Sequence, residues 1–118
     1  MMKKIEILEL PEFSKEFKRL FKKYSSLDRN LEEVKSLLIL FPDESPPFSF
    51  RINGLGIETC IIKVKKIASD NFKARGRNSG FRLVYAWFPE NSSLTLIELY
   101  HKSEKALENR DRILRNFK

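Results

Sequence analysis

The sequence predicts a small α+β fold in which helices pack on one face of an antiparallel sheet. Apolar residues recur at helical spacing in the first third of the chain, and they follow strand-like patterns from Thr59 onward. The 118 residues, 42% of them hydrophobic, are enough for one domain and few for two. We therefore expect a single domain over residues 1–118, with elements in the order β-α-α-β-β-β-α.

The first part of the chain reads as a strand followed by a helical hairpin. Residues 4–10 mostly alternate and predict a strand, and Pro11 suits the first turn of a helix because its missing N–H is not needed there. Ser25 and Asp28 resemble a capping box that begins a second helix, which should end before Pro42. The apolar positions are Phe13, Phe17, Leu20, Phe21 and Tyr24 in the first helix, and Leu27, Leu31, Val34, Leu38 and Phe41 in the second.

The second part of the chain reads as a sheet closed by a short helix. Strands are expected at 60–67, 81–88 and 94–100, with a short edge strand at 48–52. A tight turn at 91–93 makes the last two strands an antiparallel pair. Ser103 is expected to cap the final helix, whose apolar stripe would be Leu107, Leu114 and Phe117.

Positive charge is concentrated in one segment. The chain carries 23 Lys and Arg against 16 Asp and Glu, a net charge of +7. Between Lys63 and Arg82 there are seven cations and one anion, Asp70, so twenty residues hold +6 of that excess. Such a local positive potential attracts phosphates. The alternative is a solvated basic hairpin that binds no partner.

The two-residue period of strands predicts that several of these cations lie on one face of the sheet. Lys63 and Lys65 share one face of their strand, and an antiparallel neighbour brings Arg82 to the same side. Because burying unpaired ammonium groups is costly, that face should be open to solvent or to a ligand. Lys102 and His101 would arrive there from the end of the last strand.

This cluster suits phosphodiester chemistry. Arginine binds phosphate oxygens bidentately, a lysine whose pKa is lowered by like charges can deprotonate a ribose 2′-hydroxyl, and another cation can protonate the leaving oxygen. Lys63, Lys65, Arg82, His101 and Lys102 are therefore the candidate catalytic residues. His101 is the only histidine and can also be an ordinary strand-end residue that makes one hydrogen bond.

The candidate RNA-binding residues flank this cluster. They are the cations Lys66, Lys73, Arg75 and Arg77 and the aromatic Tyr100, which can stack on a base or belong to the core. No metal site or cofactor is expected, since one His and one Cys, Cys60, cannot supply a set of metal ligands.

Three segments resemble one known family: Lys63–Lys65, Asn78–Tyr85, which contains the pattern S-G-[FY]-R-[LV]-V-Y, and Leu99–Lys105. They look like the RelE/ParE superfamily of bacterial toxins and are most similar to the RelE/HigB-type mRNA interferases. The resemblance covers almost the whole chain in element order. It implies a RelE-like fold with an N-terminal strand, a helical hairpin, an antiparallel sheet and a short C-terminal helix.

The resemblance also implies a function. It points to the toxin of a toxin–antitoxin pair, a ribosome-dependent endoribonuclease that cuts messenger RNA in the A site by attack of the 2′-hydroxyl. Lys63 and Lys65 match the family's basic strand residues, Arg82 matches its phosphate-stabilising arginine, and Lys102 falls near a second family arginine. The implied partners are a cognate antitoxin, which can form a hetero-oligomer with the toxin, and the ribosome with its messenger.

The chain departs from the family in two places. Residues 106–118 contain no tyrosine, whereas some members use a C-terminal one, and the loop 68–79 is longer and carries extra cations. Two alternatives therefore stay open: a ParE-like gyrase inhibitor and a non-catalytic RNA-binding module of the same fold.

Location is predicted from composition. The longest apolar run, Leu37–Phe41, is far shorter than the roughly 18 residues of a membrane span. The N-terminal carboxylates break any signal-peptide core, and a lone cysteine fits a reducing compartment. We expect a cytoplasmic protein with no membrane partner.

Overall fold

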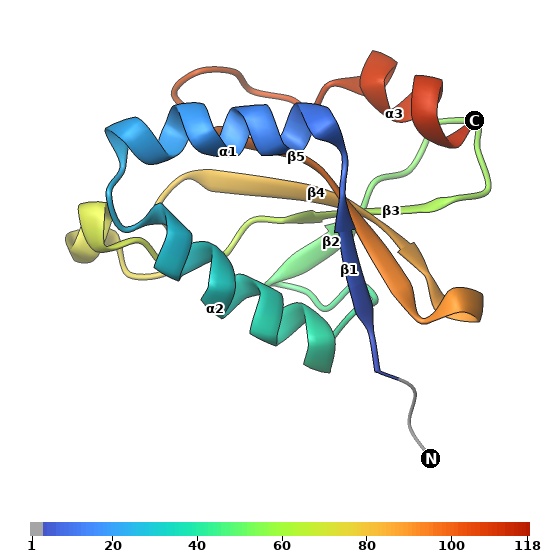
Figure 1. Cartoon of the computed structure of the whole chain (residues 1–118), viewed down its shortest axis with the longest axis horizontal. Helices are drawn as coiled ribbons and strands as arrows, with labels where there is room; N and C mark the ends of the chain where they lie inside the picture. The colour runs from blue at the N-terminus through green and yellow to red at the C-terminus, as the bar shows by residue number, and fades with distance from the viewer. Residues whose placement is uncertain (1–3) are drawn as a thin grey trace.

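The computed structural model describes residues 4–118 and has an α+β fold with a five-stranded, mostly antiparallel sheet (Figure 1). The strands are β1 (Glu6–Glu9), β2 (Ser49–Arg51), β3 (Cys60–Val64), β4 (Phe81–Phe88) and β5 (Ser93–His101), and the helices are α1 (Pro11–Lys23), α2 (Leu27–Leu40) and α3 (Arg110–Phe117). Short 3₁₀ turns, η1 (Asp70–Arg75) and η2 (Pro89–Asn91), lie before and after β4. None of the helices in residues 4–118 is long and apolar enough to cross a membrane.

The sheet has the order β1-β5-β4-β3-β2. β4 and β5 form the expected antiparallel hairpin, whose turn places Ser92 in the left-handed conformation at φ 48°. β2 pairs antiparallel with β3 and confirms the predicted edge strand. The fully antiparallel prediction is wrong at the other edge, where β1 runs parallel to β5 with Ile7 opposite Leu94. The pairing partner of β1 lies more than eighty residues away, so local periodicity carries no information about its direction.

Helices α1 and α2 cover one face of the sheet and bury the main core. Pro11 occupies the first turn of α1, as predicted. Phe13, Leu20 and Leu38 are buried against strand residues that include Val64 and Leu83. Here the 3.6-residue period of the two helices and the two-residue period of the strands agree on one core.

The second helix does not use the predicted capping box. Its N-cap is Ser26 rather than Ser25, and no side chain caps it. The Ser26 hydroxyl is hydrogen-bonded instead to the amide oxygens of Asn30 and Asn71, at 2.8 and 2.9 Å. A tertiary contact to the loop after β3 therefore replaces the local cap.

Helix α3 contradicts the prediction that all helices share one face. Ile113 and Phe117 pack with Ile61, Val84 and Ile97 in a second core cluster, on the side of the sheet opposite α1 and α2. The bulge in the β4–β5 pairing between Val84 and Tyr85 changes the alternation of β5 at this point. The protein thus has a sheet covered in part on both faces.

The final helix also begins later than expected. Its N-cap is Asn109, whose side chain accepts a hydrogen bond from the Arg112 amide at 3.1 Å, and Ser103 caps nothing. Buried Glu98 anchors the preceding segment, because its carboxylate accepts the Asn109 amide at 2.8 Å and pairs with Lys105. Leu107, one of the predicted stripe residues, is 64% exposed.

Candidate functional site: a basic cleft at the sheet end

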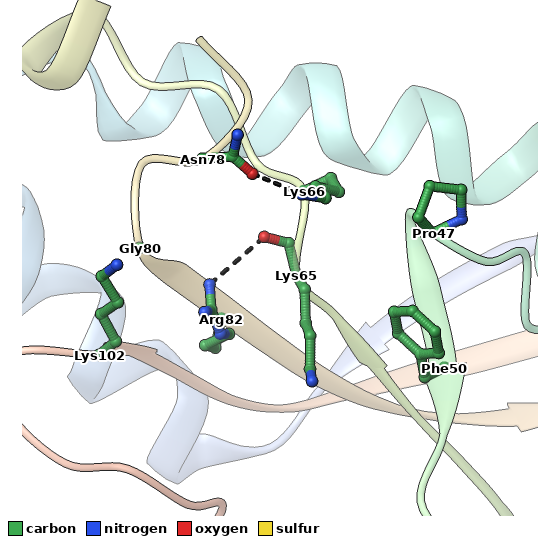
Figure 2. A pocket seen from close by; sticks show the side chains of 8 residues that line it. All are labelled: Pro47, Phe50, Lys65, Lys66, Asn78, Gly80, Arg82 and Lys102. Carbon is green, nitrogen blue, oxygen red and sulfur yellow. Dashed lines mark hydrogen bonds between the residues drawn. The ribbon is translucent and has the colours of Figure 1, made fainter. Parts of the chain in front are cut away.

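A cleft of about 490 Å³ opens where β3 ends and β4 begins, at the end of the sheet (Figure 2). Four consecutive strands contribute side chains to it, from β2, the end of β3, β4 and the end of β5. The lining residues are Pro47, Phe50, Lys65, Lys66, Asn78, Gly80, Arg82 and Lys102. We call this the basic cleft, because four of its residues are cations and none is acidic.

Lys65 and Arg82 form the centre of the basic cleft. The β3–β4 register places Val64 opposite Leu83, so continuing it by one residue sets Lys65 opposite Arg82. The Arg82 Nη1 donates to the Lys65 carbonyl at 3.3 Å and to the Phe81 carbonyl at 3.2 Å. Both bonds use one nitrogen, so the guanidinium is oriented while its remaining donors are available to a ligand, as far as residues 4–118 are concerned.

Lys66 and Lys102 extend the positive charge on either side. The Lys66 Nζ donates to the Asn78 side-chain oxygen at 2.6 Å, which holds the ammonium beside the loop that leads into β4. The Lys102 amide donates to the Gly80 carbonyl at 2.8 Å and continues the β4–β5 pairing by one residue. Figure 2 shows Lys102 and Lys65 on either side of Arg82.

The charge of the basic cleft is not neutralised within the part of the chain that the structure describes. None of its four cations lies within 4 Å of a carboxylate, whereas other surface cations do, as in the Arg19–Glu104 pair at 2.9 Å. Unpaired cations that converge in a concave site raise the local concentration of anions. The basic cleft is therefore a candidate site for phosphate groups.

Lys63 does not reach the basic cleft and corrects the expectation of an open face. It is buried, and its Nζ donates to the Glu108 carboxylate at 2.9 Å. Burial alone would lower the pKa of Lys63, but the neighbouring Glu108 and Tyr100 side chains together outweigh burial and raise that pKa above its ordinary value. Burial favours a higher pKa for Glu108, but the Lys63 bond, a backbone hydrogen bond and the charges of Lys63 and Arg110 together outweigh burial and lower that pKa. The segment before α3 thus offsets the cost of burying the ammonium with an ion pair.

His101 lies on the other face of the sheet, behind the basic cleft rather than in it. Its ring stacks on Tyr24 and Phe72, with centroids 6.1 and 5.1 Å away, and meets Phe81 edge-on at 5.0 Å. Alternation along β5 separates His101 from Lys102, which is why only the second of the two reaches the cations.

The hydrogen bonds of His101 identify its tautomer. The Ser103 amide donates to Nδ1 at 3.1 Å, so Nδ1 is an acceptor and the proton is on Nε2, which donates to the Ser79 carbonyl at 2.9 Å. Gly80, with φ +98°, lies close to this ring, and a Cβ there would lie 2.7 Å from Nε2. His101 therefore supports the Gly80 wall of the basic cleft.

The predicted RNA-binding residues lie in different places. Lys66 lines the basic cleft, and Arg75 is exposed on η1. Arg77 is exposed, with its guanidinium 5.5 Å from the Phe48 ring. Tyr100 is buried at 2% exposure, so its ring is not available for stacking. Lys73 belongs to η1, and its side chain lies outside what the structure describes.

Sequence reasoning missed Phe50, Pro47, Asn78 and Gly80 in the lining. One signal was available for Phe50, because an edge strand paired antiparallel with the Lys63–Lys65 strand brings an aromatic ring next to the lysines. Phe50 is opposite Lys63 in the register, and the Lys65 Nζ lies 5.3 Å from its ring centroid. The pairing of this edge strand was not deduced from the sequence.

Within residues 4–118 no three His, Cys, Asp or Glu side chains are grouped as metal ligands would be. Comparisons of the chain with models of protein families, with curated proteins and with solved structures found no match.

Proposed function

We propose that the protein is an endoribonuclease toxin of the RelE/HigB type, which cuts messenger RNA on the ribosome in the cytoplasm. The observation that carries the proposal is the convergence of Lys65, Arg82, Lys66 and Lys102 on one cleft without a neutralising carboxylate in residues 4–118. Three of them lie on segments that carry the resemblance to that family, and the fourth directly follows one.

The reaction assigns one role to each central cation. Lys65, in its neutral form, takes the proton of the 2′-hydroxyl, whose oxygen attacks the adjacent phosphorus. Arg82 stabilises the extra negative charge on the phosphorane, and its two bonds to backbone carbonyls hold it in place beforehand. The phosphorus–O5′ bond breaks, Lys102 gives a proton to the leaving oxygen, and a 2′,3′-cyclic phosphate remains. No metal ion enters this scheme.

A second candidate is an RNA-binding module that does not cleave. It is favoured by the lining of the basic cleft, which among residues 4–118 includes no histidine and no carboxylate for acid–base catalysis, and by the position of His101 and Lys63 outside the cleft. In this case the same cations bind the backbone phosphates and no strand scission follows.

Mapping RNA 5′ ends after induced expression tests the proposal. The wild type should arrest growth and produce new ends within translated messengers, and Arg82→Ala should lower the cleavage rate on ribosomes by about 10²–10³-fold. Arg115→Ala is the matched control, because this arginine is exposed on α3, near Glu12 and away from the basic cleft. Intact messenger with RNA binding would favour the binding module, and double-strand DNA breaks with intact messenger would favour a gyrase inhibitor.

A toxin needs a partner that masks it. We propose a cognate antitoxin whose acidic, partly disordered segment covers the basic cleft, since unpaired cations attract such a segment. Co-purification from the native operon tests this, and a wild-type protein that purifies alone and does not arrest growth would contradict it.

A further inference from the structure

An exposed aromatic ring borders the basic cleft on the edge strand. Phe50 is 37% exposed, and its ring faces the cleft together with Pro47 (Figure 2). A single exposed apolar side chain is ordinary on a protein surface. The position of Phe50 is not ordinary, because Leu40 and Leu107 are more exposed and neither lines the basic cleft.

The ring and the cations form a continuous row. Phe50 is on β2, Lys65 follows β3, Arg82 is on β4 and Lys102 follows β5, and these four strands are neighbours in the sheet. With adjacent strands about 4.8 Å apart, the row is roughly 14 Å long, which exceeds a single phosphate group. The row therefore fits a short stretch of nucleic-acid backbone with the aromatic ring at one end.

The chemistry of this end suits an unpaired base. Aromatic side chains stack on bases in single strands, and every base offers a π-face. A phosphate bound by Lys65 brings its own nucleoside next to the Phe50 ring, because the Lys65 Nζ is 5.3 Å from the ring centroid. In a duplex both faces of each internal base are covered by its neighbours, so only a single strand or a strand end can use the ring.

We propose that Phe50 is a base-stacking platform, and that the ligand of the basic cleft is single-stranded RNA with one unpaired base on this ring. The inference rests on the RNA binding that the proposed function requires, and it adds a residue that contacts a base and determines specificity. It also predicts a preference for purines, whose larger ring system covers more of the platform.

Fluorescence anisotropy at low salt tests the platform with four probes: a short oligoadenylate, an oligouridylate, an abasic ribose-phosphate oligomer of equal length, and a duplex of that length. The wild type should bind oligoadenylate most tightly. Phe50→Leu should weaken oligoadenylate binding by about 5- to 150-fold, which corresponds to the loss of one base–aromatic stacking contact. It should leave the affinity for the abasic oligomer unchanged. Phe50→Trp should retain the affinity of the wild type.

Phe21→Leu is the matched control, because Phe21 has a similar exposure of 39% and lies on α1, outside the basic cleft. It should change none of the four affinities. If Phe50→Leu does not fold, the comparison of oligoadenylate with the abasic oligomer on the wild type still decides the question.

The failures of the two proposals differ. Equal affinity of the wild type for oligoadenylate and for the abasic oligomer would overturn the stacking platform and leave RNA binding intact. Unchanged oligoadenylate binding by folded Phe50→Leu would do the same, as would a duplex that binds as tightly as the single strand. If no probe binds the wild type, direct RNA binding by the basic cleft is wrong and the stacking platform is overturned with it, and the mapping of RNA 5′ ends on ribosomes then decides the proposed function separately.

Discussion

Replacing Lys63 by methionine separates a structural lysine from a functional one. Lys63 and Glu108 have side chains only 11% and 4% exposed, with Nζ and Oε1 2.9 Å apart. Removing the ammonium takes from the buried Glu108 carboxylate its nearest cationic partner, and breaking such a pair costs about 3–5 kcal/mol. The exposed Arg110, whose Nε lies 3.6 Å from Glu108, compensates in part. We therefore expect a loss of about 3 kcal/mol, a large share of the stability of a small domain.

Urea unfolding at pH 7 measures this loss. With an m-value of about 1.5 kcal/mol/M, the midpoint of Lys63→Met should fall by about 2 M. Lys65→Met makes the same substitution at an exposed position in the basic cleft and should change stability by less than about 0.5 kcal/mol. The double variant Lys63→Met/Glu108→Leu should recover much of the loss, because it removes both charges.

RNA affinity and stability should rank Lys63→Met and Lys65→Met in opposite order. Folded Lys63→Met should bind oligoadenylate like the wild type, and Lys65→Met should bind it more weakly. A Lys63→Met protein that unfolds at the urea concentration of the wild type would refute the buried ion pair. Loss of RNA affinity in folded Lys63→Met would show that Lys63 contacts the ligand, which contradicts its position outside the basic cleft.

Three further predictions concern the same region. The folded-state pKa of Glu108 lies below its ordinary value. Its contribution to stability is therefore present above about pH 4.3 and is lost as the pH falls through the folded pKa. The urea midpoints of the wild type and of Glu108→Gln should accordingly converge in acid. Gly80→Ala should lower the free energy of unfolding by about 2–5 kcal/mol, since it combines a positive φ with a Cβ 2.7 Å from His101. Gly54→Ala has a positive φ and nothing within 4 Å of the new Cβ, so its loss should be about 1–3 kcal/mol. Equal thermal shifts for the two variants would contradict the close contact at Gly80. His101→Gln can still donate to the Ser79 carbonyl and should bind oligoadenylate like the wild type. His101→Asn loses that bond and should bind oligoadenylate about 2- to 12-fold more weakly. The reverse order of affinities would show that the Nε2 bond does not position the cleft wall.

Much of the local structure could be predicted from the sequence, because it depends on residues close together in the chain. The strand 81–88 matches β4 at both ends, and the 3.6-residue spacing from Phe13 to Leu38 identifies the two helices and their buried face. The expected antiparallel pairing brought Arg82 to the side of Lys65, and the β3–β4 register places both residues there, at the centre of the basic cleft.

The predictions that failed depended on partners distant in sequence. The parallel pairing of β1 with β5, the position of α3 on the second face and the replacement of the Ser25 cap all involve contacts between segments far apart in the chain. The helix expected from Ser103 starts only at Arg110, because Glu98 on β5 binds the Asn109 amide and Lys105. Local sequence patterns do not predict contacts between such distant segments.

The sequence by itself determined that cations are concentrated between Lys63 and Arg82 and that Lys63 and Lys65 share one side of their strand, since alternation fixes the side of each residue along a strand. The tertiary structure alone decided which cations are accessible. Lys63 and Lys65 are equivalent in the strand pattern, but Glu108, 45 residues away, covers the first and leaves the second open. Burial and charge pairing are properties of residues that meet only after folding, so the membership of the basic cleft, including Phe50, could be read only from the folded chain.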